Sequence, residues 1–135
     1  MKKILFLCFV SVFLVSCSTR IYQLHYVVDL RSYSEQGFFI TESNSVNFEY
    51  TPVGSVETIA GGVDNSGRNK NYDDVSYKYT QGHGYTLTTA GAMSMFVDKC
   101  KELNADAVIN FSINTSIDKN GNPSHRISGM AIKMK

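Results

Sequence analysis

Imidazole, thiol and carboxylate side chains are the groups through which this chain could bind a metal ion or act as a nucleophile. The sequence has no Cys-x-x-Cys or His-x-x-x-His spacing, and Asp73-Asp74 is its one close acidic pair. The three histidines, His25, His83 and His125, are isolated from one another. Because a local metal site needs closely spaced ligands, we predict no metal site and no cofactor, and we expect the histidines to lie on the surface.

Cys17 stands in the most specific pattern of the chain. Two lysines at positions 2 and 3 precede a largely apolar run of residues 4–15, which is too short to span a bilayer as a helix and is typical of a signal peptide. The run leads into Leu14-Val15-Ser16-Cys17. This segment resembles the lipobox of bacterial lipoproteins, in which the cysteine thiol takes a diacylglycerol. We therefore predict a signal peptide over residues 1–16 and a lipidated, palmitate-bearing Cys17.

The predicted lipid anchor determines the compartment and the first partner. Ser18 follows the cysteine, in place of the aspartate that retains many bacterial lipoproteins in the inner membrane. The resemblance therefore points to the outer membrane of a bacterial cell envelope. An ordinary secretory signal followed by a chance cysteine is the alternative, and it leads to the same compartment. The membrane, reached through the lipid anchor, is the first predicted partner.

The charge balance excludes nucleic acid as a partner. The chain has 13 lysines and arginines against 12 aspartates and glutamates, and two of the lysines leave with the predicted signal peptide. A nearly neutral mature chain has no basic field to hold a phosphate backbone. The composition, 43% apolar and 19% charged, is typical of a single globular domain.

Cys100 lies in a segment with a clear helical period. Thr86 or Thr88 can cap the start of this helix, and Asn104 can take the left-handed turn that ends it. Cys100 is then expected to be buried as a small hydrophobic residue, without a histidine or a cation on its own face to activate the thiol. The apolar positions that define the period are spaced three and four residues apart, at Ala90, Met93, Val97, Cys100 and Leu103, with Phe96 beside them.

Catalysis by Cys100 would need a base that the fold brings to it. Spacing leaves open a pair with His83 or His125, because such partners meet only in the folded chain. The sequence has no nucleophile elbow, and its glycine pairs lack the lysine of a phosphate-binding loop. The expected burial of Cys100 also argues against a reactive thiol. We therefore predict that the protein is not an enzyme.

Two runs after the helix predict a β-hairpin. Ile109, Phe111 and Ile113 alternate with polar residues, which predicts a strand whose three apolar side chains share one face. Asn120-Gly121 is a strong signal for a tight turn. Residues 127–134 then form the return strand.

Residues 17–36 are predicted to form the lipidated terminus, a tether and an arm. Tyr22, Leu24 and Tyr26 alternate there with polar residues, which predicts a strand or an extended arm. Short apolar runs after residue 37 predict further strands. We expect the folded domain to cover residues 37–135.

A long polar segment between Asp64 and Gly84 is predicted to be a loop. Loops of this length inside a compact domain are often functional, and tyrosines are frequent at contact surfaces. The alternative is a solvated loop whose tyrosines cover the edge of the core. The candidate residues of this interaction loop are Tyr72, Tyr77, Tyr79, His83 and Tyr85.

The end of the predicted helix and the last strand carry a family resemblance. Residues 100–110 read Cys-Lys-Glu-Leu-Asn-Ala-Asp-Ala-Val-Ile-Asn, and residues 127–133 read Ile-Ser-Gly-Met-Ala-Ile-Lys. This resembles the YbjQ family of heavy-metal-binding domains, in which a helix ends in Leu-Gly-Ala-Asp-Ala-Val-Val-Gly and a final strand reads like Val-Ser-Gly-Thr-Ala-Val-Lys. More distantly, the chain is similar to the RcsF type of outer-membrane lipoprotein.

The resemblance implies a two-layer α+β domain with a β-β-α-β-β core, in which a small antiparallel sheet is backed by one main helix. It also implies ring-like oligomers, so a homo-oligomer is expected. We place the assembly surface at the edge around Ile127 to Ala131, because an open apolar edge must be paired or covered. Gly129 and Ala131 either let a second layer approach there or face the helix of their own chain.

These expectations converge on a cell-envelope lipoprotein whose domain serves interaction or assembly without catalysis, with a second copy or an envelope protein as partner. An envelope-stress sensor or regulator, implied by the RcsF type, is one alternative. A metal-binding module, implied by the YbjQ family, is the other. No internal disulfide is expected, because Cys8 leaves with the signal peptide, Cys17 takes the lipid and Cys100 remains alone.

Overall fold

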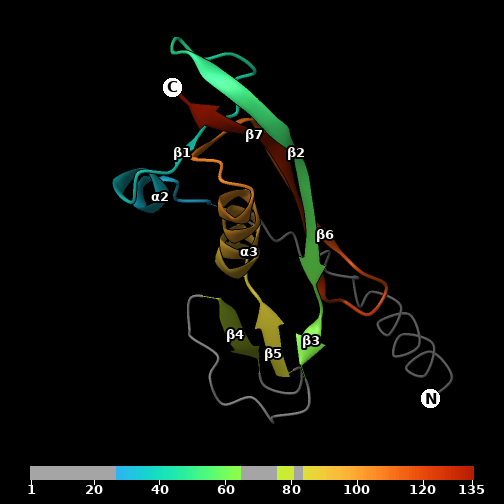
Figure 1. Cartoon of the computed structure of the whole chain (residues 1–135). Coiled ribbons are helices and arrows are strands. Elements are labelled where there is room, and N and C mark those ends of the chain that lie inside the picture. Colours follow the sequence, from blue (N-terminus) through green and yellow to red (C-terminus); the bar gives the residue numbers. More distant parts are fainter. Residues whose placement is uncertain (1–26, 65–75, 81–83) are drawn as a thin grey trace, which may run out of the picture.

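The computed structural model describes residues 27–64, 76–80 and 84–135. A four-stranded sheet carries the main helix, and a smaller three-stranded sheet lies beyond the start of that helix (Figure 1). The predicted α+β class is confirmed. In chain order the elements are α2 (Arg31–Glu35), β1 (Phe39–Ile40), β2 (Tyr50–Gly61), β3 (Val63–Asp64), β4 (Tyr77–Thr80), β5 (Gly84–Leu87), α3 (Thr89–Glu102), β6 (Ala107–Ile117) and β7 (Pro123–Met134).

The main sheet has the strand order β1-β6-β7-β2. β6 and β7 form the predicted hairpin, with Ala107 opposite Ile132 near one end and Ile117 opposite Pro123 at the other. β2 pairs antiparallel with β7 along its length, whereas the two residues of β1 pair parallel with β6. The sheet is therefore antiparallel apart from β1.

The smaller sheet, with the order β3-β5-β4, lies partly in the segment predicted to be a loop. Tyr77–Thr80 form β4 and pair antiparallel with β5. The loop prediction is wrong for these residues. A four-residue strand is too short for its alternation to stand out in the sequence, and its hydrogen bonds come from a neighbouring strand.

The helix α3 forms where the sequence predicts it. The hydroxyl oxygen of Thr88 accepts a hydrogen bond from the amide of Gly91 at 3.1 Å, so Thr88 is the cap. Asn104 takes the predicted left-handed turn, with φ of 61°. Ala90 and Leu103, expected on the buried stripe, are exposed because they lie at the two ends of the helix. The buried apolar side chains of α3 are Ala92, Met93, Phe96, Val97 and Cys100.

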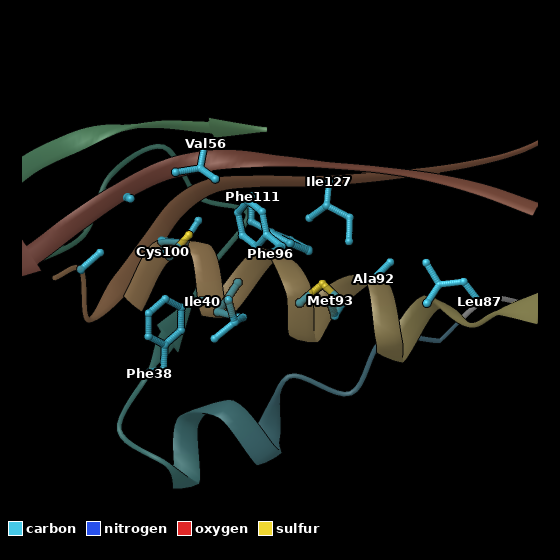
Figure 2. Packing of buried hydrophobic residues seen from close by; sticks show 14 residues of the cluster. Phe38, Ile40, Val56, Leu87, Ala92, Met93, Phe96, Cys100, Phe111 and Ile127 are labelled. Atoms are coloured by element: carbon cyan, nitrogen blue, oxygen red, sulfur yellow. The ribbon is translucent and has the colours of Figure 1, made fainter. Parts of the chain in front are cut away.

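The core lies between α3 and the main sheet (Figure 2). Phe96 of α3 packs against Phe111 of β6 in an edge-on arrangement, with ring centroids 6.1 Å apart. Val56 of β2 and Ile127 of β7 complete the sheet side of this cluster. Burial of these large side chains is the main source of stability for the two layers.

A β-bulge divides β6 and distributes its apolar residues over both faces of the sheet. The pairing with β7 shifts between Ile109 and Ser112, and Asn110 takes a φ of 53°. Phe111 therefore belongs to the core cluster with α3, whereas Ile109 packs with Ile132 in a second cluster. The prediction that Ile109 and Phe111 share one face is wrong, because the extra residue of a bulge reverses the alternation.

The second cluster is covered by the segment between β1 and β2. The amide of Asn110 donates to the carbonyl of Ser43 at 2.8 Å, and the amide of Phe111 donates to the carbonyl of Thr41 at 3.0 Å. The bulge is thus held by hydrogen bonds to this segment. Its apolar side chains over the cluster are Val46 and Phe48, and Tyr50 at the start of β2 packs beside them.

β7 is an interior strand, with β6 on one side and β2 on the other. Ala131 is fully buried in the core cluster with α3, and a Cβ added at Gly129 would collide with Val108. Of the two orientations that the sequence leaves open, the one facing the helix is therefore correct. The predicted assembly edge around Ile127 to Ala131 is wrong, because β2 lies outside it.

The N-terminal end of the described chain is helical where the sequence predicts a strand or an extended arm. Arg31–Glu35 form α2, and the carboxylate of Asp29 accepts a hydrogen bond from the amide of Arg31 at 3.0 Å, which favours a turn there. Val28, Leu30 and Tyr33 pack partly buried against the core. The folded domain thus begins before the predicted boundary at residue 37.

Candidate functional site

Several residues with predicted roles lie outside the described residues, namely Cys17, His25, Tyr72, Asp73-Asp74 and His83. Lipidation at Cys17 therefore stays a prediction. In the described ranges, no helix combines the length and apolar character needed to cross a membrane. Among the same residues, no group of three histidine, cysteine or acidic side chains gathers to hold a metal ion.

Three tyrosines of the predicted interaction loop come together on the smaller sheet. Tyr79 of β4 lies opposite Tyr85 of β5, and their ring centroids are 5.2 Å apart. Tyr77 lies opposite Leu87, so the strand alternation places all four side chains on one face. Tyr79 is 60% exposed, whereas Leu87 is buried in the core.

This face forms one wall of a groove, which we call the tyrosine groove. Its volume is about 400 Å³. Met95 of α3 lines it and is 43% exposed, and Ile59 of β2 is 62% exposed. The groove thus combines aromatic, aliphatic and thioether groups in a concave surface that is open to solvent. The lining residues are 59–63 at the end of β2 and the start of β3, Tyr77, Tyr85, Leu87 and Met95.

Contacts between α3 and the start of β4 hold this wall in place. The hydroxyl of Thr88 donates to the carbonyl of Ser76 at 2.9 Å, and the amide of Thr88 donates to the same carbonyl at 2.8 Å. A Cβ at Gly91 would lie 2.5 Å from that carbonyl oxygen. Only a residue without a side chain at position 91 allows the backbones to approach so closely.

His125 connects the smaller sheet to the main sheet. Its ring is 2% exposed, with Nδ1 3.0 Å from the hydroxyl oxygen of Thr115 and Nε2 3.4 Å from the carbonyl oxygen of Leu87. A carbonyl oxygen only accepts, so the N–H at Nε2 donates to Leu87, and Nδ1 shares a hydrogen bond with the Thr115 hydroxyl, which can donate or accept. The expectation of a surface histidine is wrong for His125, because β7 places it on the same face as the core residue Ile127.

Cys100 is fully buried, as predicted. Burial disfavours the charged thiolate and raises the pKa of the Cys100 thiol to about 11. Because the Cys100 thiol is buried, a substrate or ligand in solvent cannot reach it in the conformation described. It contributes to the core as a small apolar side chain.

Alkylation of Cys100 is expected to be slow in the folded protein. The thiolate is the reactive species, so between pH 7 and 10 the rate should rise about tenfold per pH unit while it stays far below the rate in urea. Since folding raises this pKa, the stabilisation from the neutral thiol should be lost as pH rises from about 9 towards 11. Iodoacetamide labelling followed by mass spectrometry measures both rates, and equal rates in folded and unfolded protein would contradict the assignment.

A larger hollow of about 570 Å³ lies between α2 and α3. Its lining includes the carboxylates of Asp29 and Asp98, and Asp29 is paired with Arg31 at 2.7 Å. Burial, and then the charge of Asp98, raise the pKa of Tyr33 in its wall above the ordinary value. This hollow is more charged than the tyrosine groove, which is therefore the stronger candidate for binding an apolar protein surface.

The residues that complete the groove are not apparent from the sequence pattern. Met95 lies outside the apolar stripe of α3. An apolar side chain on the polar face of a helix is a sign of a contact surface, and this sign could have identified Met95. No sequence pattern marks residues 59–63 at the end of β2 as part of the site. They come to lie beside the tyrosines only in the folded chain. Asp106 was also missed as a structural residue: its carboxylate accepts from the amide of Met134 at 2.7 Å and pairs with Lys133 at 2.7 Å.

Comparisons with known proteins identify a similar structure of unknown function. No family model matches the sequence, and a search of curated proteins gives no match. The chain is similar to a crystal structure from Pediococcus pentosaceus, described as a protein of unknown function in the DUF74 family. The two share 25% sequence identity over 74% of this chain and 100% of the other, with a TM-score of 0.49. DUF74 is a family with a YbjQ-like fold.

Proposed function

We propose that this protein is a lipid-anchored component of the bacterial outer membrane whose YbjQ-like domain binds another protein through the tyrosine groove, without catalysis. The observation that carries the proposal is the groove itself, which Tyr77, Tyr85 and Met95 line with large side chains, with Met95 43% exposed. Tyrosine and methionine are enriched at protein interfaces. Exposure of their apolar surface to water is unfavourable in free energy, and a bound partner that covers this surface removes the unfavourable contribution.

The structural roles of the reactive groups support a function without catalysis. His125 uses both ring nitrogens to join the two sheets, and Cys100 is packed in the core. Neither residue lines the groove. The groove therefore offers tyrosine and methionine side chains for apolar contact, which are enriched at protein interfaces.

The anchor is supported by the sequence before the domain. Leu14-Val15-Ser16-Cys17 has the order of a lipobox, and Ser18 follows it. Three acyl chains, as mature bacterial lipoproteins carry, hold a protein firmly in a membrane, whereas one chain binds only marginally. The domain would then be tethered to the outer membrane by the residues between Cys17 and the folded part.

Labelled palmitate is expected to enter the wild-type protein and to be absent from Cys17→Ser. The reason is that the Cys17 thiol receives the lipid, and serine cannot form the thioether. Growth of producing bacteria with labelled palmitate, followed by purification and gel detection, measures incorporation. Cys100→Ala is the matched control and should be labelled like the wild type. Equal labelling of the wild type and Cys17→Ser would refute the anchor.

A photo-reactive benzoylphenylalanine in place of Met95 is expected to give protein adducts of defined mass in intact cells. The side chain at this position contacts whatever occupies the groove. Ile117 is the matched control, because it is 61% exposed and does not line the groove. Gel shifts and mass spectrometry identify the adducts. The same adducts from both positions, or none from Met95, would contradict a protein-binding groove.

A further inference from the structure

The hollow between α2 and α3 is a second concave surface, separate from the tyrosine groove. α2 lies on the side of α3 that is turned away from the β6–β7 hairpin (Figure 2), and the hollow shares no lining residue with the groove. Its volume of about 570 Å³ is in the range of sites that take small molecules. A ligand in this hollow would leave the groove free, so its binding does not rest on the protein-binding role proposed above.

The wall of the hollow combines apolar surface with a phenol. Val28 and Tyr33 are partly buried and pack against the core, and Ala90 at the start of α3 is exposed beside them. The hydroxyl of Tyr33 has no hydrogen-bond partner among the described residues. A bound molecule can therefore place apolar groups on this wall and a polar group on the phenol.

Asp98 of α3 brings a negative charge to the hollow that no direct contact neutralises. Its carboxylate forms no ion pair or hydrogen bond with the other described residues. Burial and then the charge of Asp98 raise the pKa of Tyr33, which places this charge near the phenol. Asp29, the other carboxylate of the lining, differs because the guanidinium of Arg31 donates to it at 2.9 and 2.7 Å.

Lys101 brings a positive charge to the same hollow, one turn further along α3. Residues three apart on a helix are neighbours and often form ion pairs, as Lys99 and Glu102 do at 2.7 Å in α3 itself. The ammonium of Lys101 instead lies 5.8 Å from the ring centroid of Phe38. Since no ion pair joins it to Asp98 in the described part of the chain, the hollow presents a carboxylate and an ammonium that are both open to a ligand.

We propose that this hollow binds a short zwitterionic peptide, two or three residues long, with apolar side chains. The free ammonium of the peptide pairs with the carboxylate of Asp98, and its free carboxylate pairs with the ammonium of Lys101. Its side chains cover Val28 and Ala90. Charge-assisted hydrogen bonds of this kind are stronger than bonds between neutral groups, and each protein group that makes a contact is accessible in the free chain.

The spacing of the two charges favours a peptide over a single amino acid. The Cβ atoms of residues three apart on a helix are about 5–6 Å apart, and the ammonium of Lys101 is held over Phe38 instead of beside Asp98. An extended chain spans about 3.3–3.6 Å per residue, so the two ends of a dipeptide or tripeptide can reach both charges. In one amino acid the ammonium and the carboxylate are joined through a single carbon and lie too close together.

Ligands with other charges fit the hollow less well. A cationic ligand would meet the like charge of Lys101, and an anionic ligand would meet the like charge of Asp98, and both contacts are repulsive. A neutral apolar molecule would remove both charged side chains from water without giving them a partner, which is unfavourable. A zwitterion avoids the repulsion and the loss of hydration together.

Isothermal titration calorimetry with leucyl-leucine tests the site in the full-length protein in detergent. Binding of one peptide per chain is expected. N-acetyl-leucyl-leucine lacks the ammonium and leucyl-leucine amide lacks the carboxylate, so each should bind at least about tenfold more weakly, as loss of one charge-assisted hydrogen bond predicts. Absence of binding at millimolar leucyl-leucine, or equal affinity for a blocked peptide, would overturn the proposal.

Two substitutions at exposed positions of α3 assign each charge to one end of the peptide. Asp98→Asn should abolish the preference for leucyl-leucine over the N-acetyl peptide, and Lys101→Gln should abolish the preference over the amide. Glu102→Gln is the matched control, because it removes a carboxylate of the same helix that does not line the hollow. Circular dichroism checks that the variants are folded. Preferences that survive in both variants, or that are lost equally in the control, would refute the site, whereas adducts at Met95 would be unaffected.

Discussion

Phe96→Ala is expected to lower the free energy of unfolding by about 3–5 kcal/mol. Phe96 is fully buried at the centre of the core, against Phe111, and its removal leaves a cavity that α3 and the main sheet cannot both close. Urea denaturation followed by circular dichroism measures the loss. The reason is packing alone, because the side chain carries no polar group.

The neighbouring residue provides the control for Phe96. Met95→Ala changes a side chain that is 43% exposed, so the free energy of unfolding should change by less than about 1 kcal/mol. If the two substitutions had equal effects, the helix would be rotated relative to the sheet and the core assignment would be wrong.

Gly91→Ala is expected to destabilise the protein by about 1–3 kcal/mol. In an exposed helix the same change would stabilise by about 1 kcal/mol, so the sign itself is informative. The new methyl group would lie 2.5 Å from the carbonyl oxygen of Ser76 and 2.8 Å from a methyl carbon of Leu87. Backbone at Ser76 cannot move away without breaking its hydrogen bonds to Thr88.

Gly54→Ala is the matched control for Gly91→Ala. A Cβ at Gly54 meets nothing within 4 Å, and its backbone has no positive φ. Its thermal midpoint should stay close to that of the wild type in differential scanning calorimetry. A stabilised Gly91→Ala would show that β4 does not approach α3 as described.

The helix and the hairpin could be predicted because their signals are local. Thr88 caps α3 through a residue three positions away, and Asn104 ends it through its own backbone. Asn120-Gly121 turns the chain between two strands that follow each other directly. Such features need only neighbouring residues, which the sequence displays in order.

The rest depends on contacts between distant segments. The bulge at Asn110 is stabilised by a hydrogen bond to the carbonyl of Ser43. The alternation of apolar and polar residues in β6 does not indicate this bulge. The same limit applies to the candidate site. Tyr77, Tyr79 and Tyr85 were predicted as contact residues, but Met95 joined them only through the packing of α3. The sequence wrongly predicts an open edge at β7, because the residue pattern of β7 does not show that β2 lies outside it in the sheet.

The imidazole of His125 links the groove to the main sheet, because it joins Thr115 in β6 to the last residue of β5. We expect the strands that carry the tyrosines to unfold together with the main sheet. Local opening of the hairpin would release the groove wall as well, and their amides should exchange with solvent together. A partner in the groove would accordingly protect the distant hairpin from exchange, because it stabilises the unit that both belong to.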